Sequence, residues 1–407
     1  MTDVDVAIVG GGMVGASLAL ALSGTGVSAL LIEGVAPGSN AQPSFDERTT
    51  ALGNASRRIF EGLGVWPRIA RETAAIQTIH VSDAGRFGFA RLRAADQGIE
   101  AFGYVAANRA IGTALWERLG QAGNIALRMP ARAESVEIAV DGVRLTVVNE
   151  DGTYEPVRAR LVVAADGANS VVRAAAGIGA SVEDYSQVAV IANVAADRPH
   201  DSTAYERFTA TGPLAVLPLH DGSLGIIWTG TPERAAEILD CPDEVFLREL
   251  QIRFGWRAGK FIRVSRRSSY PLKLTRSAAA TAARTVLIGN AAQALHPIAG
   301  QGFNLGLRDA AMLAELLLAG ADGDVGAPAL LARFAQWRSE DRQGVIRFTD
   351  GLVKLFGDSR FGVGALRNLG LLLFDLAPSA KSALARVSAG FAGPSPRLAR
   401  GLTLRHG

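Results

Sequence analysis

Near its start the chain has the mainly apolar run Val4-Asp5-Val6-Ala7-Ile8-Val9, followed directly by Gly10-Gly11-Gly12-Met13-Val14-Gly15. The run is rich in Val, Ala and Ile and predicts a buried β-strand. The small residues of Met13–Leu22 predict a helix, and Val27–Ile32 predicts a second buried strand. The stretch therefore indicates a strand-turn-helix-strand unit.

The glycines of the turn have the G-x-G-x-x-G spacing. Gly10 allows a tight turn, Gly12 lets the backbone approach a pyrophosphate, and Gly15 lets the helix pack close to the strand. The helix starts at Met13, where free N–H groups can bind phosphate. Glu33 ends the second strand, where a carboxylate can bind ribose hydroxyls. The unit predicts an ADP-containing cofactor and does not distinguish NAD from FAD.

Length and composition describe a globular chain. The 407 residues suggest two or three structural units. With 48% hydrophobic and 20% charged residues, the chain can bury a large core, and disorder is excluded as its main state. The single cysteine, Cys241, excludes a disulfide framework within the chain and a cysteine-cluster metal site. We expect no metal.

The formal net charge is +3, and the charge is unevenly distributed. Residues 250–308 contain many Lys and Arg side chains and no Asp or Glu. This stretch is either a solvated basic face or an attractor of anions such as a cofactor phosphate, a pyridine nucleotide or acidic lipid. Nucleic acid is not expected, because no recognised binding motif accompanies the charge.

The uncharged run 6–32 is long enough to span a bilayer. Its many glycines make a poor membrane helix. The acidic Asp3 and Asp5 do not suit the basic start of a signal peptide. We therefore expect a cytoplasmic protein and leave open contact with the inner face of the membrane.

The rest of the chain mixes helical and strand patterns. Helices are expected over 47–60, 108–119, 234–254, 310–319, 330–347 and 353–387, and strands over 136–148, 157–164, 268–274 and 285–288. Residues 185–230 are strand-rich, and residues 76–105 are irregular with short alternating patches.

Two further motifs follow buried strands. Leu161–Ala165 leads through Asp166-Gly167 towards a helix, which Asp166 can cap. Val286–Ile288 leads into Gly289-Asn290-Ala291-Ala292. The segment His296–Asp309 then carries Gly300 and Gly302, which let the backbone approach a flat ligand. The helix after Asn304 points its positive end at that ligand.

With these three motifs in this order, the whole chain resembles the flavoprotein aromatic hydroxylases of the p-hydroxybenzoate hydroxylase fold. Within them it is similar to the ubiquinone-biosynthesis hydroxylases. The segments that carry this similarity are Asp46–Leu52, Tyr185–Gln187, Glu206–Phe208 and Gly212–Leu219. Gly289–Asp309 is especially close to the 2-polyprenyl-6-methoxyphenol hydroxylase branch, in which Asn290 typically replaces the usual family aspartate. A plain NAD dehydrogenase would leave the Asp166 and Asn290 motifs unexplained.

The resemblance implies an α/β fold with interleaved domains. A Rossmann-type FAD-binding domain would comprise residues 1–75, 101–178 and 275–345. A β-sheet substrate domain would comprise residues 76–100 and 179–274, and a helical region would follow over 346–407.

The resemblance also implies the site residues. FAD would be held by Gly10, Gly12, Met13, Gly15, Glu33, Arg48, Arg109, Asp166, Asn290, Gly300, Gly302, Phe303 and Asn304. Relatives often carry Glu where Ala107 stands. Pro297 would line the flavin face. His296 would accept or relay the phenol proton, or else be a structural histidine.

The implied reaction is hydroxylation of a polyprenylated phenol. NADH or NADPH would reduce FAD, and O2 would then form a flavin C4a-hydroperoxide that transfers one oxygen to the ring. Three alternatives stay open: a hydroxylase of another ring position, another flavin enzyme of this fold such as a prenyl reductase or halogenase, and a non-catalytic FAD-binding scaffold. The Trp-x-Trp-x-Ile-Pro signature of the halogenases is absent. The scaffold would act among other quinone-biosynthesis proteins.

The C-terminal residues combine basic charge with apolar side chains. Residues 359–407 have seven Lys or Arg residues against the single acid Asp375, with a leucine-rich run at 366–374. This composition suits an interfacial helix on anionic lipid. The leucines can equally pack on the FAD domain or on a partner subunit.

Overall fold

The computed structural model describes residues 2–36, 39, 48–84, 89–209, 211–294, 301–320, 323–339 and 395–404. Its eight-stranded sheet contains β1 (Thr2–Val9), β2 (Ala29–Ile32), β8 (Ile125–Arg128), β9 (Ala131–Ile138), β10 (Val143–Asn149), β11 (Tyr154–Ala164), β18 (Thr281–Ala282) and β19 (Thr285–Leu287). The order is β18-β19-β11-β1-β2-β8, with β10 and β9 added beside β11. Strands β19, β11, β1, β2 and β8 run parallel.

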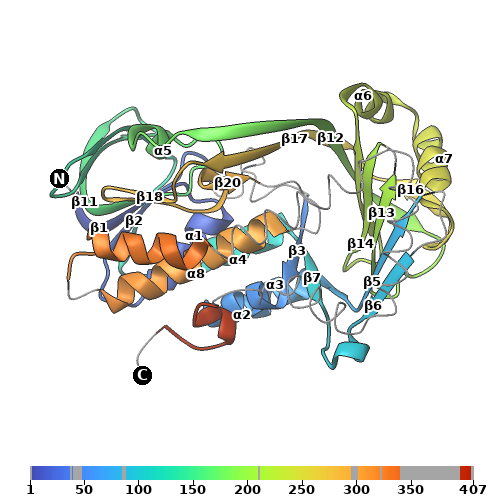
Figure 1. The fold of residues 1–407 in the computed structure, drawn as a ribbon, viewed down its shortest axis with the longest axis horizontal. Helices are drawn as coiled ribbons and strands as arrows, with labels where there is room; N and C mark the ends of the chain where they lie inside the picture. The colour runs from blue at the N-terminus through green and yellow to red at the C-terminus, as the bar shows by residue number, and fades with distance from the viewer. Residues whose placement is uncertain are drawn as a thin grey trace.

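Helices cover one face of this parallel sheet. These are α1 (Met13–Leu22), α4 (Asn108–Leu119) and α8 (Gln301–Ala319) (Figure 1). Val6 and Ile8 pack against this layer, whereas Ala7 and Val9 belong to a second core with β10 and β11. The central strands are apolar on both faces because both faces are covered. The helices predicted over 13–22 and 108–119 are confirmed.

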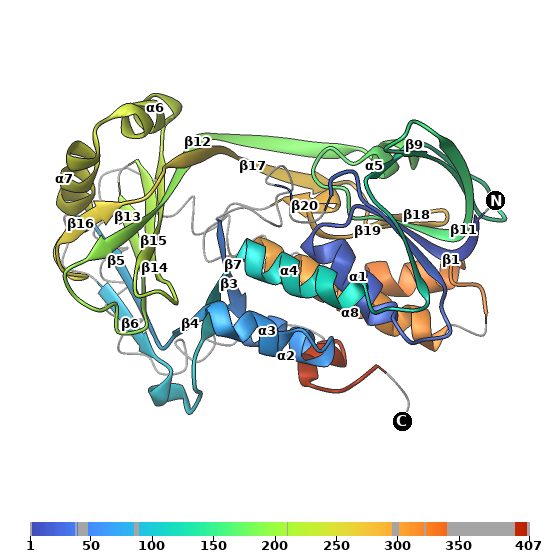
Figure 2. The same ribbon diagram turned by 180° about the vertical axis from the view of Figure 1, so that it is seen from behind.

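A nine-stranded sheet forms the other end of the molecule (Figure 2). It contains β5 (Thr78–Asp83), β6 (Phe89–Arg93), β12 (Ala180–Ala196), β13 (Thr203–Thr209), β14 (Gly212–Pro218), β15 (Leu224–Gly230), β16 (Phe261–Val264), β17 (Ser268–Ser277) and β20 (Gln293–Ala294). The order is β20-β17-β12-β15-β14-β13-β5-β6, with β16 beside β12. Helices α6 (Pro232–Asp240) and α7 (Asp243–Phe254) pack on its outer face. The long antiparallel pair β12 and β17 reaches from this sheet towards the parallel sheet.

A small antiparallel sheet lies between the two. It contains β3 (Thr49–Gly53), β4 (Thr73–Ile76) and β7 (Gly103–Ala107), in the order β3-β7-β4. Helices α2 (Asn54–Gly62) and α3 (Trp66–Ile69) accompany it. The shorter helical turns of the chain are α5 (Val171–Ala175), η2 (Ala70–Glu72), η3 (Ala95–Gln97), η4 (Gly289–Ala291) and η6 (Leu398–Arg400).

Several predicted elements are wrong in type or number. The helix predicted over 47–60 begins only at Asn54, because Thr49–Gly53 pairs with Gly103–Ala107. Arg48 therefore precedes a strand. The helix predicted over 234–254 is two helices, since Pro242 cannot donate a backbone hydrogen bond.

Two stretches contain more strands than predicted. The strand predicted over 136–148 is a hairpin that turns at Asp141-Gly142. The stretch 76–105 holds β5, β6 and most of β7. Short strands of this kind gain their stability from cross-strand partners, which the local pattern does not show.

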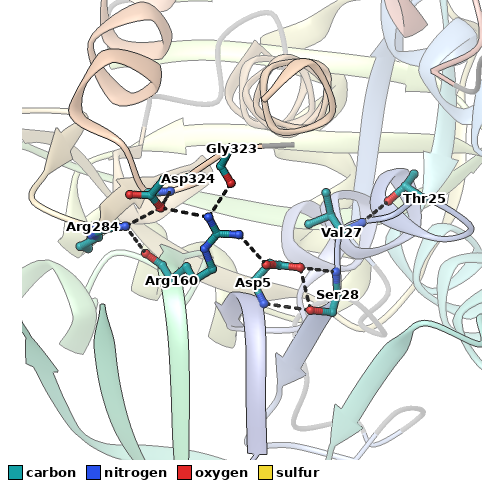
Figure 3. A network of polar contacts seen from close by, with 9 residues as sticks. Asp5, Thr25, Val27, Ser28, Arg160, Arg284, Gly323 and Asp324 are labelled. Carbon is teal, nitrogen blue, oxygen red and sulfur yellow. Dashed lines mark hydrogen bonds and ion pairs between the residues drawn. The ribbon is translucent and has the colours of Figure 1, made fainter. Parts of the chain in front are cut away.

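A polar network lies at the end of the parallel sheet where β2 and β19 begin (Figure 3). Asp5 accepts hydrogen bonds from Ser28 N at 2.9 Å and Ser28 Oγ at 2.8 Å, and pairs with Arg160 at 3.1 Å. Arg160 also donates to Gly323 O. Arg284 pairs with Asp324 at 2.6 Å, so the segment after α8 is tied to the sheet.

The helical residues 328–339 pack on α8 through one buried ion pair. Arg338 Nε lies 2.7 Å from Asp309 Oδ1, and both side chains are fully buried. The helix predicted over 330–347 is thus seen only to residue 339. The helix predicted over 353–387 lies outside the described residues.

Candidate functional site

The carboxyl ends of the parallel strands meet at one edge. Val9 pairs in register with Ala164 and Ile32, and Ala164 pairs with Leu287. The residues that follow these strands are Gly10 after β1, Glu33 after β2, Asp166 after β11 and Asn290 after β19. Open parallel sheets bind ligands at this edge.

The glycine turn after β1 has no room for a Cβ at Gly10 or Gly15. Gly10 has φ +101°, and a Cβ there would collide with the backbone of Ala165. A Cβ on Gly15 would collide with Gly10 O, so helix α1 packs directly on the turn. Gly12 is the N-cap of α1, with φ −60° and ψ 176°, and Met13 is its first residue. The turn thus presents backbone N–H groups at a helix start.

Glu33 folds back onto the same turn. Its Oε2 accepts a hydrogen bond from Gly11 N at 2.6 Å, and its Oε1 accepts one from Val35 N at 2.9 Å. A carboxylate can accept about four hydrogen bonds, so capacity for ribose hydroxyls remains.

Asp166 has one satisfied and one unsatisfied oxygen. Its Oδ2 accepts from Val171 N, the first residue of α5, at 2.8 Å, while Ser170 is the N-cap of that helix. Its Oδ1 is buried and makes no hydrogen bond within the part of the chain that the structure describes. Burial raises the pKa of this carboxyl above its usual range, although hydrogen bonds to it act in the opposite direction. A hydroxyl donor from a bound ligand would satisfy Oδ1, so the site fits a polyol-bearing cofactor such as FAD.

The turn after β19 carries Asn290 with an exposed side chain. Gly289 has φ +57°, and a Cβ on Gly306 of α8 would lie 3.0 Å from the Gly289 Cα, so α8 approaches the turn closely. Arg173 joins this turn to the Asp166 turn by donating to Ala291 O at 3.0 Å and to Ala168 O at 2.7 Å. No local sequence pattern indicated this bridging role of Arg173.

Asn304 and Phe303 hold α8 against the neighbouring elements. Asn304 Oδ1 accepts from Gly53 N at 2.9 Å and from Ser56 Oγ at 2.6 Å, and its Nδ2 donates to Ala51 O at 2.8 Å. The Phe303 ring stacks on Phe60 with centroids 6.2 Å apart. The Asn304 amide is therefore engaged within the protein, and its predicted cofactor contact would have to come from the backbone. Gly302 lies in the first turn of the same helix.

Arg48 and Arg109 lie together at one end of the small sheet. Asn108 N donates to Arg48 O at 2.8 Å, which places Arg109 next to that junction. The Arg48 guanidinium lies 5.9 Å from the centre of the Tyr270 ring, and Arg109 pairs with Glu72 at 2.9 Å. The sequence did not predict this proximity. A helix was expected over 47–60, whereas Thr49–Gly53 is a strand that pairs with β7.

Three predicted site residues, His296, Pro297 and Gly300, lie outside the described residues. An additional polar group is found at Gln187. Its buried Oε1 lacks a hydrogen bond among the described residues. Its Nε2 lies 3.3 Å from where a Cβ on Gly212 would stand. The Tyr185–Gln187 and Gly212–Leu219 segments support the family resemblance, and this was the only sequence signal for Gln187.

Known proteins match along nearly the whole chain. An FAD-binding domain family model matches residues 3–349. The ubiquinone hydroxylase UbiL of Rhodospirillum rubrum is 38% identical, over 98% of this chain and 93% of its own length. The 3-demethoxyubiquinol 3-hydroxylase of Escherichia coli is 31% identical, over 92% of this chain and 95% of its own length.

Solved structures show the same fold. The p-nitrophenol 4-monooxygenase PnpA of Pseudomonas putida superposes with a TM-score of 0.79 at 21% identity, over 97% of this chain and 99% of its own. PqsL of Pseudomonas aeruginosa superposes with a TM-score of 0.75 at 22% identity, over 91% of this chain and 100% of its own. Among the described helices none is both long and apolar enough to cross a membrane. The site geometry and these similarities lead to one conclusion: the chain belongs to the FAD-dependent hydroxylases of ubiquinone biosynthesis, a family of flavin monooxygenases with the p-hydroxybenzoate hydroxylase-like α/β fold.

Proposed function

We propose that this protein hydroxylates the aromatic ring of a polyprenylated phenol at the 2-polyprenyl-6-methoxyphenol step of ubiquinone biosynthesis. The family supports the pathway and the flavin chemistry. The observation that carries the step is the Gly289–Asp309 segment, in which Asn290 replaces the usual aspartate and stands exposed at the carboxyl edge. A second candidate is the 3-demethoxyubiquinol step, which the name of the E. coli relative favours.

The chain's own residues would bind and orient the cofactor. The Gly10–Gly15 turn offers N–H groups to a pyrophosphate, and Glu33 and Asp166 Oδ1 accept from hydroxyls. Gly300 and the backbone N–H groups of Gly302–Asn304 would face the flavin ring, with the positive end of α8 stabilising negative charge there. When bound, FAD supplies the redox chemistry, taking electrons from NADH or NADPH and using O2. Arg48 and Arg109 are proposed as further cofactor ligands.

The substrate would lie between the carboxyl edge and the nine-stranded sheet. We assign residues 1–75, 101–178 and 275–345 to FAD binding and residues 76–100 and 179–274 to the substrate domain. Gln187 Oε1 is an acceptor that a substrate hydroxyl could satisfy. Pro297 is proposed to line the flavin face, and His296 to accept or relay the phenol proton.

The apolar substrate suggests contact with a membrane surface. The proposed contact is the C-terminal region 346–407, and its leucine-rich part lies outside the described residues. Within 395–404, Leu398 and Ala399 are buried and Arg397 N donates to Glu315, so this short part packs on the protein. Co-sedimentation with anionic vesicles at low salt is expected and should weaken with salt. A protein that ignores such vesicles would require a partner to deliver the substrate.

The reaction step is tested by quinone profiling of a strain that lacks this protein. Accumulation of 2-polyprenyl-6-methoxyphenol would support the proposal, whereas accumulation of 3-demethoxyubiquinol would favour the second candidate. Purified holoenzyme should also oxidise NADH or NADPH when a prenylated phenol is added. A yellow protein that oxidises neither with any phenol would instead be a scaffold.

A further inference from the structure

The two faces of the nine-stranded sheet have different surroundings. On strand β13, Tyr205 packs edge-on against Phe254 of α7, and Arg207 Nε donates to Arg253 O at 3.0 Å. These odd-numbered residues define the outer face. The even-numbered residues Ala204, Glu206 and Phe208 point to the opposite, inner face, because successive side chains of a strand alternate.

Glu206 interrupts an apolar row on the inner face. Neighbouring strands pair residue by residue along this row. The paired residues, taken in order across the sheet, are Ile191, Ile227, Ala215, Glu206, Val81 and Ala90. Directly paired residues share a face, so the row crosses six strands. Glu206 is the only charged residue in this row.

The inner face is turned towards the proposed FAD-binding body. Figures 1 and 2 show α6 and α7 on the side of the nine-stranded sheet that faces away from the parallel sheet. Strands β3 and β7 lie on the side that faces the parallel sheet. A Cβ on Gly225 would lie 3.6 Å from Thr49 Oγ1 at the start of β3. Tyr270, which pairs with Ala189 on this face, carries the guanidinium of Arg48 over its ring. The inner face therefore borders a proposed cofactor ligand.

Among the residues that the structure describes, the carboxylate of Glu206 has no partner. It makes no hydrogen bond or ion pair within the described part of the chain. The side chain keeps some surface that water can reach. Even so, burial alone raises the pKa of Glu206 to about 7. Native proteins rarely leave a buried carboxylate unpaired without a functional reason.

We propose that Glu206 is a catalytic residue that accepts the proton of the substrate's phenol hydroxyl. This inference rests on the proposed function and names a residue of the same site; it gives the first acceptance of the proton to Glu206 and leaves His296 only the relay. The phenol O–H bond breaks, an O–H bond forms on the carboxylate, and the electron pair stays on the phenol oxygen, where it enriches the ring for attack by an electrophilic oxygen. The proton then passes to water, and this step involves no oxidation or reduction. A general base works best when its pKa lies near the operating pH.

Other ionisable groups near this face could influence the titration. Strand β5 places Asp83 beside Phe208 on the inner face, and β17 and the start of β3 contribute Tyr270 and Arg48. Strands β14 and β15 contribute none, since they present Ala215, Leu217, Ile227 and Thr229. His80 and Arg91 pair on the outer face. The residue that causes each limb of the pH profile must therefore be identified with variants.

The first test is the pH dependence of kcat/KM with 2-geranyl-6-methoxyphenol, a short-chain phenol. The wild type should lose activity as the pH falls below about 7, because the base becomes protonated. Glu206→Gln should lower kcat by roughly 10²–10⁴-fold and abolish that acid limb. Glu206→Asp should partly restore both. Glu244→Gln, an exposed carboxylate of α7, is the matched control and should behave as wild type.

The second test uses binding to the holoenzyme, followed by the absorbance of bound FAD. Wild type should bind the phenol roughly ten- to a hundredfold more tightly than its O-methyl ether, which lacks the proton. Glu206→Gln should reduce this preference. FAD content and thermal stability should not fall in the variant. Its melting temperature relative to wild type should be higher at about pH 8 than at about pH 5, because the ionised carboxylate costs stability above the usual carboxyl pKa.

The possible failures point to different conclusions. A wild type that neither binds nor turns over the phenol would overturn the proposed function and this role with it. A wild type that turns over the phenol, with Glu206→Gln keeping the acid limb and the ligand preference, would overturn only the inference about Glu206. An acid limb that disappears in His296→Asn but persists in Glu206→Gln would assign the proton to His296 instead.

Discussion

Two aspartates on adjacent strands of the parallel sheet have opposite environments. Asp5 lies on β1, where β2 and β19 begin, and Asp166 follows β11 at the carboxyl edge. Asp5 is partly buried, which by itself raises its pKa, but hydrogen bonds from Ser28 and Arg160 outweigh burial and lower the pKa below the usual value. Burial dominates at Asp166 and raises its pKa. One end of the sheet thus satisfies its charges internally, and the other leaves Asp166 Oδ1 as an acceptor with no hydrogen bond among the described residues.

This difference shows how one sheet can be both scaffold and site. The network of Asp5, Arg160, Arg284 and Asp324 fixes strands and the connection after α8. The carboxyl edge instead holds glycines at which a Cβ would collide with neighbouring atoms, the buried Asp166 Oδ1 and the exposed Asn290. Substitutions at the first end should alter stability, and substitutions at the second should alter FAD binding.

The largest expected effects come from two glycines of one turn, where substitution should remove FAD binding in one case and folding in the other. Gly12 has an extended conformation open to any residue, so Gly12→Val should fold and lose FAD, because the side chain blocks the pyrophosphate. Gly10→Val should fail to fold, since its φ is positive and its Cβ would meet Ala165. Circular dichroism and the FAD released on denaturation measure the two effects. A Gly12→Val protein with full FAD content would contradict the assignment of this edge.

The buried ion pair of α8 gives the next largest effect. Asp309→Ala leaves Arg338 charged and fully buried, and should cost about 3–5 kcal/mol in the free energy of unfolding. Asp309→Leu combined with Arg338→Met should recover much of this loss. Urea denaturation of the apoprotein measures both. A loss below about 1 kcal/mol would show that the pair contributes little to stability.

Asn290 tests the exposed side of the carboxyl edge. Asn290→Leu should weaken FAD binding by about 1–3 kcal/mol, the cost of a lost hydrogen bond. Asn290→Asp should be tolerated, because an aspartate can accept from the same hydroxyl. Fluorescence titration of the apoprotein with FAD gives both affinities. Unchanged affinity in the Leu variant would remove Asn290 from the site.

The smallest effect compares the two aspartates directly. Asp5 has a lowered pKa, so its ionised form stabilises the protein above about pH 3.8, and Asp5→Asn should cost about 1 kcal/mol at neutral pH and less in acid. Asp166 has a raised pKa, so its charge opposes folding above that pH. Asp166→Asn should therefore stabilise the apoprotein at neutral pH and not in acid. Denaturation curves at several pH values distinguish the two signs. If both substitutions changed the stability at neutral pH in the same direction, the proposed contrast between the two ends of the sheet would be wrong.

Local features were predictable because they depend on neighbours in sequence. The glycine turn, helix Met13–Leu22 and helix Asn108–Leu119 carry their signals within a few residues. The helix expected over 47–60 was wrong because the partner of Thr49–Gly53 is a strand that starts at Gly103. Pairing over that separation leaves no periodic trace in the local sequence.

The sequence alone determined the family, the cofactor class and the order of the strand-to-turn motifs, since fixed backbone geometry requires glycine and short polar residues at fixed spacings. The tertiary structure decided which of those polar groups remain available. Asn304 is engaged by Gly53 and Ser56, whereas Asp166 Oδ1 is not engaged within the described chain. It also decided that Glu206 stands in an apolar row with no partner among the described residues, because six strands from distant parts of the chain must align before its surroundings exist. Burial and hydrogen bonding are properties of neighbours in space, and these set the chemistry of a carboxylate.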